Sequence, residues 1–361
     1  MISFARGAPA PECLPVAELA DCARAALERD GVPVLSYGPG GGYPPLREWL
    51  AERHGVEPGR VVMTSGSLQG FVFLAETLVR PGARVLVEAP TYDRPLKILA
   101  RLGAEVEALP MDDEGLDPDA LEQALASGEP PAFLYTIPTF QNPSGRTLSE
   151  ERRRALVDIS RRHDLLVLED DPYGLVRFEG APLPSLHQLE GGDRIIYSSS
   201  FSKTVAPGVR VGWFVLPAEL AAQIEALAVS TYISPPYLSG ATVYEFVRRG
   251  RFEPNVARVS GLLAARRDAM VSALDEHFPQ ARRSSPEGGY FVWLELGGGL
   301  DTTALLEQAT EAGVTFVAGR DFFPGGSAGM DALRLAFSFV SPAEISDGIA
   351  RLAAVAASVP V

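Results

Sequence analysis

Short apolar runs alternate with amphipathic segments along the chain from about residue 60. The runs contain few polar positions, which is typical of strands covered on both faces of a parallel sheet. The segments between them repeat hydrophobic residues with the 3.6-residue period of a helix. Strands and helices in alternation predict an α/β domain with a mostly parallel sheet between helices. The predicted strands cover residues 84–88, 132–137, 165–168 and 194–197, and the predicted helices cover residues 67–79, 92–102, 117–126 and 149–162.

The pattern changes after about residue 245. Helices at 254–277, at 303–312 and from 342 with strands at 289–294 and 333–339 are typical of a smaller α+β domain. The first 15 residues begin apolar and contain repeated proline, so we expect them to be extended. We predict a segment at residues 1–35 that packs near the functional site as part of the small domain, a large domain at 36–250 and a small C-terminal domain at 251–361.

The charge of the chain excludes several classes of partner. Its 361 residues are enough for about two or three domains. The 32 basic and 46 acidic residues give a net charge of −14. A field of that sign repels nucleic-acid phosphates and anionic lipid surfaces. We therefore expect neither nucleic acid nor a membrane among the partners.

Cysteine and histidine give no sign of a metal site or a disulfide framework. The two cysteines, Cys13 and Cys22, lie outside any C-x-x-C pattern. The four histidines are scattered, and none stands at ligand spacing from another histidine or a cysteine. No apolar window approaches the ~18 residues that span a bilayer. These features predict a cytoplasmic protein without a bound metal.

Lysine is rare in this chain. Lys97 and Lys203 are the only lysines among the 32 basic residues. Arginine cannot replace lysine where a neutral amine must act as a nucleophile, because guanidinium stays protonated. Lys203 lies in the hydroxyl-rich stretch S-S-S-F-S-K-T directly after a predicted strand, whereas Lys97 lies on an amphipathic helix and is expected to be solvated. Lys203 is therefore the candidate nucleophile.

Hydroxyl and guanidinium groups near this lysine are suited to binding an anion. Ser200 and Ser202 precede it and Arg210 follows it, and an arginine can bind two oxygens of one phosphate. Upstream, small residues in T-S-G-S-L-Q-G at 64–70 open a predicted helix, whose first amide groups also favour anions. Ser67 in this stretch equally fits an ordinary helix cap.

Two further polar residues follow predicted strands, where open α/β sheets bind their ligands. Asp170 lies in L-E-D-D-P-Y. An aspartate there would keep a heterocyclic nitrogen protonated, because opposite charges within ~4–6 Å favour the charged form of both partners. Alternatively, one of Asp170 and Asp171 caps a turn or a helix and takes no part in binding a ligand. Asn142, in F-Q-N-P-S-G, is also a common turn residue.

The chain resembles the pyridoxal-phosphate (PLP) aminotransferases of fold type I. It is similar to the class I/II branch with the 2-aminoadipate, kynurenine and aromatic aminotransferases and the effector domains of MocR-type regulators. The similarity runs from I-S-F-A-R-G at residues 2–7 to L-R-L-A-F-S at residues 333–338. Its most specific motif is S-F-S-K-T-V-A-P-G-V-R-V-G-W at residues 200–213. The fold that the resemblance implies has the large and small domains predicted above.

The resemblance implies a role toward PLP for each candidate residue. Lys203 would form the internal aldimine and later move the α-proton of the substrate. Asp170 would pair with the pyridinium nitrogen, and Tyr173 and Asn142 would hydrogen-bond the phenolic oxygen. Tyr92 would stack on the pyridine ring. The phosphate would be held by Gly66, Ser67, Leu68, Ser200, Ser202 and Arg210.

It also implies contacts with the substrate and with a second subunit. Arg334 would bind the α-carboxylate of the substrate, with Asn142 and the backbone of Gly7 close to it. Tyr37, in S-Y-G-P-G, would reach the cofactor phosphate of the neighbouring subunit. The active sites would then be shared, and we expect at least a homodimer.

The opening segment departs from the family pattern. The chain starts at I-S-F without the extra N-terminal helix that covers the substrate in many relatives, so the resemblance implies no particular substrate side chain. Arg6 stands where glycine is common and adjoins the expected carboxylate pocket. We hypothesise that Arg6 binds an acidic substrate side chain, with a solvent-facing arginine as the alternative.

The leading hypothesis is reversible transamination between an α-amino acid and a 2-oxo acid. We expect a ping-pong order with 2-oxoglutarate as the second oxo acid. Another PLP-dependent outcome, such as β-elimination, cyclisation or decarboxylation, is the nearest alternative, because the sequence does not determine which bond of the substrate breaks. A PLP-sensing regulatory domain is a third reading, and the negative net charge disfavours it.

Overall fold

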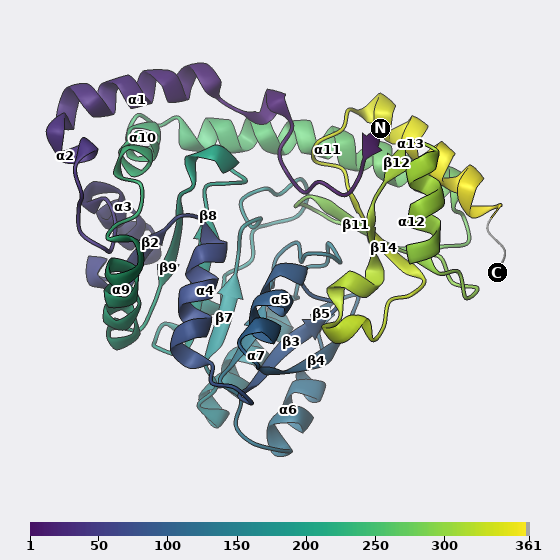
Figure 1. Ribbon diagram of the computed structural model, residues 1–361, viewed down its shortest axis with the longest axis horizontal. Coiled ribbons are helices and arrows are strands. Elements are labelled where there is room, and N and C mark those ends of the chain that lie inside the picture. The colour runs from purple at the N-terminus through teal and green to yellow at the C-terminus, as the bar shows by residue number, and fades with distance from the viewer. Residues whose placement is uncertain (359–361) are drawn as a thin grey trace.

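The computed structural model describes residues 1–358, with a large sheet at its centre (Figure 1). This sheet has eight strands in the order β2-β9-β8-β7-β6-β3-β4-β5. Strand β9 is antiparallel to both of its neighbours and β5 is antiparallel to β4, while the other pairs are parallel. The mostly parallel sheet is thus confirmed. The strands are β2 Val61–Thr64, β3 Arg84–Ala89, β4 Glu105–Asp112, β5 Gly115–Leu116, β6 Phe133–Thr136, β7 Val167–Asp170, β8 Ile195–Ser200 and β9 Gly212–Val215.

Helices cover both faces of the sheet because alternate residues of its strands point to opposite sides. Phe133 and Tyr135 of β6 belong to one hydrophobic cluster, while Leu134 belongs to the cluster on the other face. In Figure 1, α4 and α5 lie in front of the sheet. The first layer comprises α4 Ser67–Leu78, α5 Asp93–Arg101 and α9 Ala218–Tyr232, and the second comprises α6 Pro118–Ala126, α7 Glu150–His163 and α8 Leu186–Glu190.

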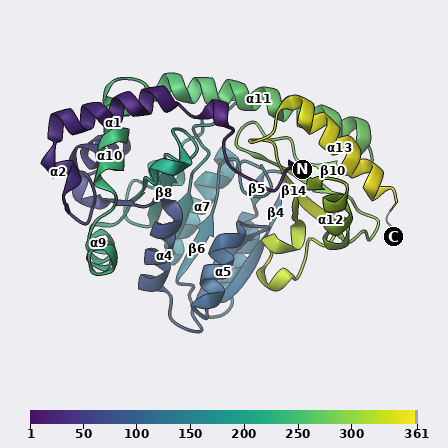
Figure 2. The ribbon, with the colours of Figure 1, turned by 45° about the horizontal axis from the view of Figure 1, so that its top comes forward.

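A smaller antiparallel sheet forms the second core, in the order β10-β11-β14-β13. The long helix α11, Phe252–His277, runs from beside the large sheet to this second core, as Figure 2 shows. The other elements here are β10 Arg282–Arg283, β11 Phe291–Glu295, α12 Thr302–Glu311, β12 Val314–Thr315, β13 Val317–Ala318, β14 Ala332–Ala336 and α13 Pro342–Ala356, with short 3-10 helices at Gly319–Phe322 and Pro324–Gly326.

The opening segment divides its contacts between the two cores. Strand β1, Ile2–Ser3, pairs in parallel with β12, and Phe4 is buried in the second core. After a 3-10 helix at Pro11–Cys13, helix α1 packs against α10 beside the large sheet. The domain boundaries predicted at residues 35 and 250 remain a proposal. The helices around this end of the large sheet are α1 Val16–Asp30, α2 Val32–Leu35, α3 Pro44–His54 and α10 Tyr237–Arg248, with 3-10 helices at Pro58–Arg60 and Pro207–Val209.

Two strands continue further than their apolar runs indicate. The run at residues 165–168 corresponds to β7, which begins at Val167 and ends at Asp170, and the run at 194–197 corresponds to β8, which extends to Ser200. Polar residues continue these strands because they find hydrogen-bond partners in the interior. Among residues 1–358, no helix combines the length and apolar character that crossing a bilayer requires.

Candidate active site

A cavity of about 250 Å³ lies where the parallel strands of the large sheet end. Strand β7 contributes its last residue, Asp170, and the opening segment, α4, α5 and β14 meet it there. The cavity brings together many of the residues that the sequence singled out, namely Gly7, Ser67, Tyr92, Asn142, Asp170, Tyr173, Lys203 and Arg334. The other lining residues are Ala5, Asp93, Arg94, Ile137, Pro172 and Phe291.

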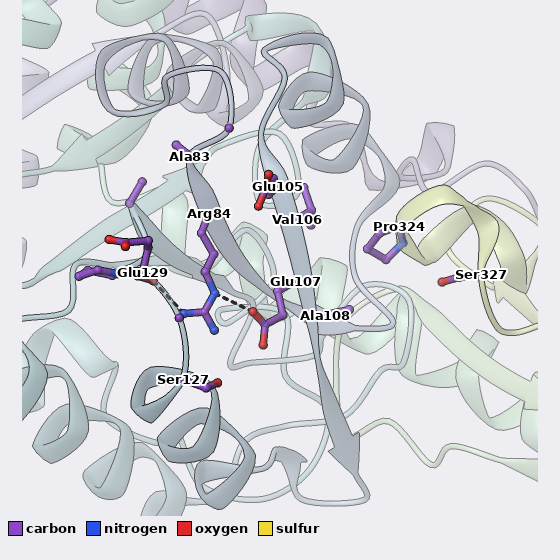
Figure 3. A pocket seen from close by; sticks show the side chains of 14 residues that line it. Ala83, Arg84, Glu105, Val106, Glu107, Ala108, Ser127, Glu129, Pro324 and Ser327 are labelled. Carbon is purple, nitrogen blue, oxygen red and sulfur yellow. Dashed lines mark hydrogen bonds and ion pairs between the residues drawn. The ribbon is translucent and has the colours of Figure 1, made fainter.

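A larger hollow, of about 980 Å³, lies at the opposite ends of the strands, where β3 and β4 begin (Figure 3). Arg84 crosses it and is fully engaged, since its guanidinium donates to Glu107 at 2.6 Å, to the Glu129 carbonyl at 2.9 Å and to the Ala124 carbonyl at 2.7 Å. No predicted site residue lines this hollow. Convergent polar groups therefore favour the smaller cavity as the functional site.

Lys203 is held between the end of β8 and the opening segment. Its Nζ donates to the Gly7 carbonyl at 2.7 Å and lies 4.9 Å from the centre of the Tyr290 ring. Burial, helped by the positive charges of Arg334 and Arg210, lowers the pKa of Lys203 to about 8. An amine with that pKa is partly neutral near pH 8 and is able to act as a nucleophile or a base.

The acidic run at the end of β7 divides into three different roles. Glu169 accepts hydrogen bonds from the first amides of α8, and Asp171 accepts one from the Gly174 amide at 2.8 Å. Asp170 faces the cavity instead. Its Oδ2 accepts from the Tyr135 hydroxyl at 2.9 Å, while its buried Oδ1 has no partner. Burial raises the pKa of Asp170 to about 7.

The start of α4 and strand β9 form a tight turn beside the cavity. Gly66 has φ +90°, and a Cβ there would lie 2.4 Å from Arg210 Nη2. Gly212, which pairs with Thr64 on one side and Ser200 on the other, would place a Cβ 2.5 Å from the Ser67 amide nitrogen. Glycine is therefore favoured at position 66 by its positive φ, and it is needed at position 212 for the two backbones to approach so closely.

Hydroxyl groups at the end of β8 lie on the other side of this turn. Ser200 Oγ donates to Ser202 Oγ at 2.7 Å, and it also accepts from the Ser202 amide at 3.0 Å. Arg210 Nη2 donates to the Ser65 carbonyl at 2.7 Å. Of the six predicted phosphate residues only Ser67 lines the cavity. The other five are not among its lining residues, namely Gly66, Leu68, Ser200, Ser202 and Arg210.

Arg334 of β14 forms the opposite wall of the cavity. Its Nη1 donates to Asn142 Oδ1 at 3.0 Å and its Nη2 to the Ala5 carbonyl at 2.8 Å. Its guanidinium carbon lies 4.3 Å from the centre of the Phe291 ring. The side chain is buried and its Nε has no partner. A buried guanidinium braced in this way is suited to a carboxylate.

Two tyrosines complete the walls. Tyr92 precedes α5, and burial raises its pKa to about 12. Tyr173 is buried after the end of β7, and burial raises its pKa far above the usual value. Both side chains are therefore neutral hydrogen-bond donors at ordinary pH.

Three residues lie apart from the cavity. Tyr37 has a side chain that is 82% exposed. The Arg6 guanidinium lies 4.4 Å from the centre of the Phe339 ring and is not part of the lining. Lys97 is exposed and pairs with Asp93 at 2.7 Å, which agrees with a solvated role.

Sequence reasoning overlooked Tyr135, the partner of Asp170. No signal in the sequence reports this contact, because it depends on the register of β6 and β7, in which Tyr135 pairs with Leu168. Asp170 follows two residues later and so points to the same face of the sheet. Phe291, which supports Arg334, was read only as part of a strand.

Among residues 1–358, no group of three or more histidine, cysteine, aspartate or glutamate side chains is arranged to hold an ion.

Comparison with known proteins gives the family. The model for aminotransferase class I and II matches residues 4–352. Aromatic-amino-acid aminotransferase 1 of Thermococcus litoralis is 35% identical over 98% of this chain and 87% of its own. The structure of LysN, an alpha-aminoadipate aminotransferase from Thermus thermophilus complexed with N-(5'-phosphopyridoxyl)-L-leucine, matches with a TM-score of 0.95 at 36% identity and covers 99% of this chain and 92% of that one. The HTH-type transcriptional regulator TauR of Rhodobacter capsulatus is 33% identical over 82% of this chain and 60% of the regulator.

The chain therefore belongs to the class I and II aminotransferases. It is an enzyme of fold type I that depends on pyridoxal phosphate. The cavity fits that cofactor in two independent ways. Asp170 Oδ1 is a buried acceptor without a partner, and the Arg210 guanidinium lies against Gly66 at the start of α4, where a cation and helix amides favour an anion. The resemblance deduced from the motifs is confirmed.

Proposed function

We propose that this enzyme transfers an amino group reversibly between an α-amino acid and a 2-oxo acid, with 2-oxoglutarate as acceptor, in a ping-pong order. One observation carries the proposal. A lysine of lowered pKa, a carboxylate with a free buried oxygen and a braced arginine all line one cavity. Together they meet the needs of an amino acid whose Cα proton must be moved while its carboxylate is fixed.

The polar residues of the cavity divide the tasks of this reaction among them. Arg334 orients the α-carboxylate through its guanidinium, and Asn142 braces Arg334. Lys203 Nζ would take the proton from Cα and, for transamination, give it to the carbon on the other side of the amino nitrogen. When bound, PLP supplies an aldehyde carbon that takes up the amino group and a ring that draws electron density away from Cα. Asp170 Oδ1 would hold the proton on the ring nitrogen.

The remaining predicted residues would fix the position of the ring and its phosphate. Tyr92 would stack on the ring, and Tyr173 and Asn142 would hydrogen-bond its phenolic oxygen. Buried tyrosine hydroxyls usually form a hydrogen bond, and a phenolic oxygen is a suitable acceptor. The phosphate would bind at the start of α4, where amides, serine hydroxyls and a guanidinium converge. Its residues are Gly66, Ser67, Leu68, Ser200, Ser202 and Arg210.

Borohydride reduction of the holoenzyme followed by peptide mapping tests the proposal, because only two lysines compete for the label. We expect the label on Lys203 and none on Lys97.

A donor amino acid should bleach the visible absorption band, and 2-oxoglutarate should restore it. Lys203→Ala should lower the rate at least about 100-fold, while the matched Lys97→Ala keeps it. Label on Lys97, or an absorption band that no amino acid alters, contradicts the proposal. Pyruvate and ammonia as products would indicate β-elimination.

A second carboxylate on the substrate would meet Arg94 and not Arg6. Arg94 lines the cavity, and its side chain is 60% exposed with its Nε 3.7 Å from Asp93 Oδ2. The Asp93 carboxylate also binds Lys97 Nζ at 2.7 Å, so it neutralises the charge of Arg94 only in part. Arg334 and Arg94 then offer one cation to each carboxylate of 2-oxoglutarate.

Replacing Arg94 tests this assignment. We expect Arg94→Gln to raise the KM for 2-oxoglutarate about fivefold or more, because a charged contact with the substrate is lost. The KM for pyruvate, which has one carboxylate, should stay unchanged. Arg6→Gln is the matched control and should alter neither constant. Equal changes for both oxo acids would refute the role of Arg94.

We also propose that the protein forms a homodimer with shared active sites. Six large apolar side chains are exposed on the segment 32–37, on α9 and the residue that follows it, and on α10. They form an apolar patch of Val32, Leu35, Tyr37, Val229, Ile233 and Leu238. The segments are adjacent, since a Cβ on Gly38 would lie 1.9 Å from Tyr237 Cζ and one on Gly40 2.3 Å from Val229 Cγ2. An exposed patch of this kind is typical of an interface, and burying it would bring Tyr37 against a second copy.

A further inference from the structure

The Tyr135 side chain is aimed at the cavity from inside the sheet. Tyr135 is fully buried, with its ring edge-on to Phe71 at 5.4 Å between centres. Its hydroxyl donates to Asp170 Oδ2 at 2.9 Å. The other oxygen of this carboxylate, Oδ1, is buried without a partner. One oxygen of Asp170 is thus fixed by the protein and the other is presented to a ligand.

The register of the two strands makes this contact specific to a long side chain. Tyr135 lies beside Leu168, two residues before Asp170. Two residues of strand span about 6.6 Å along the sheet. A phenol reaches across that distance, whereas a serine or threonine hydroxyl at position 135 would not. The tyrosine is therefore required by geometry as well as by packing.

The neighbouring strand contains a matched pair with a different outcome. The Tyr197 hydroxyl donates to Asp171 Oδ2, also at 2.9 Å. Both carboxylate oxygens of Asp171 have partners, because Oδ1 accepts from the Gly174 amide. The Tyr197–Asp171 pair closes a turn and leaves nothing for a ligand. Only the Tyr135–Asp170 pair keeps an oxygen free.

We infer that Tyr135 is a positioning residue that holds Asp170 ionised and oriented toward the protonated ring nitrogen of PLP. The inference rests on the proposed assignment of Asp170 to that nitrogen. Tyr135 does not line the cavity, and in this inference it acts on the cofactor only through Asp170. Without the Tyr135 hydroxyl, the carboxyl group would turn more easily and would hold its own proton more tightly.

The surroundings of Asp170 explain why one hydrogen bond matters. Burial and the negative charges of Asp171 and Glu88 raise its pKa to about 7, while the hydrogen bond from Tyr135 lowers it. Tyr92 and Tyr173 line the same cavity as Asp170, where Lys203 and Arg334 supply positive charge. Losing the Tyr135 donor would raise the pKa of Asp170 further, and a neutral acid no longer favours a pyridinium ion.

The test compares Tyr135→Phe with Tyr197→Phe in holoenzyme reconstituted with PLP that carries ¹⁵N in its ring. The ¹⁵N chemical shift distinguishes a protonated from a neutral ring nitrogen. We expect Tyr135→Phe to move the pH titration of this signal down by about one to two pH units, as loss of a hydrogen bond to a charged group implies. Tyr197→Phe should lower resistance to urea by a similar amount as Tyr135→Phe but leave the ¹⁵N titration unchanged.

Further variants separate the possible failures. If Asp170→Asn moves the ¹⁵N signal and Tyr135→Phe does not, the role of Tyr135 is refuted while the proposed site stands. If neither moves it, the assignment of Asp170 itself fails. Should Tyr135→Phe not fold, 3-fluorotyrosine in place of Tyr135 is a stronger donor and must shift the titration in the opposite direction. An unchanged titration in that protein would overturn the inference.

Discussion

At the scale of single residues, neighbours in the sequence acquire different chemistry from what surrounds them. Glu169, Asp170 and Asp171 are consecutive carboxylic acids at the end of one strand. Glu169 and Asp171 use their oxygens to hold backbone amides in place. Asp170 points to the opposite face of the sheet from these two and keeps one oxygen free. The alternation of side chains along a strand is what separates the three roles.

Asp170 destabilises the cofactor-free protein at alkaline pH. Its folded pKa is about 7, whereas an unfolded aspartate has a pKa of about 3.9. The stabilising contribution of the protonated group is therefore complete below about pH 4 and is lost as the pH rises through 7. Each pH unit between these two pKa values lowers the free energy of unfolding by about 1.4 kcal/mol.

We therefore expect Asp170→Asn to make the cofactor-free protein more stable at pH 8, by a few kcal/mol. The gain should become smaller at pH 5. Urea unfolding followed by circular dichroism at both pH values measures it. The exposed Asp158→Asn should show no gain at either pH. A lower stability of Asp170→Asn at pH 8 would contradict the buried, ligand-free carboxylate described here.

At the scale of elements, strand β9 governs how closely the start of α4 approaches the sheet. A Cβ at Gly212 would meet the backbone of Gly66 and Ser67 at 2.5–2.8 Å. Backbone atoms cannot move aside as a flexible side chain does. The turn that carries the candidate phosphate site therefore depends on the absence of a side chain on the neighbouring strand.

Gly212→Ala should weaken PLP binding at least about tenfold, because shifting the turn moves its amides away from the phosphate. Absorbance titration of the cofactor-free protein with PLP measures the dissociation constant. Gly208→Ala, four residues earlier in the same connection, is the control because a Cβ there would meet nothing within 4 Å. Equal affinity in the two variants would show that the turn is not the phosphate site.

At the scale of the whole molecule, the two cores and a second copy together would complete the active site. The cavity lies between the large sheet and the smaller one, with Arg334 supplied by the smaller sheet and Lys203 by the larger. Tyr37 belongs to the apolar patch and is far too exposed to serve the cavity of its own chain. In the dimer that we propose, it would serve the neighbouring one.

Leu35→Asp should disrupt that dimer, since a charge would be buried in the centre of the apolar patch. We expect a monomer at micromolar concentration in sedimentation velocity and a PLP affinity at least about tenfold weaker. Val16→Asp, at the start of α1, places the same charge on an exposed apolar residue outside the patch and should leave the assembly intact. A Leu35→Asp protein that remains dimeric would place the interface elsewhere.

Much of the fold was accessible from the sequence because the hydrophobic period records which faces are buried. The helix start at Ser149 agrees with the structure, where the Ser149 hydroxyl accepts from the Arg152 amide. The end of β7 was set too early, at Leu168. Polar residues such as Asp170 continue a strand only when another strand supplies partners, and a local pattern does not report such partners.

The order of residue types along this chain was enough to determine the α/β architecture, the family and the candidate nucleophile, because burial patterns and the chemistry of lysine are local properties. The tertiary structure alone decided which carboxylate faces the cavity, that Tyr135 holds it, and that Arg94 rather than Arg6 lines the site. These outcomes depend on strand register and on distances between segments far apart in the chain. Such distances are set by the packing of the whole molecule.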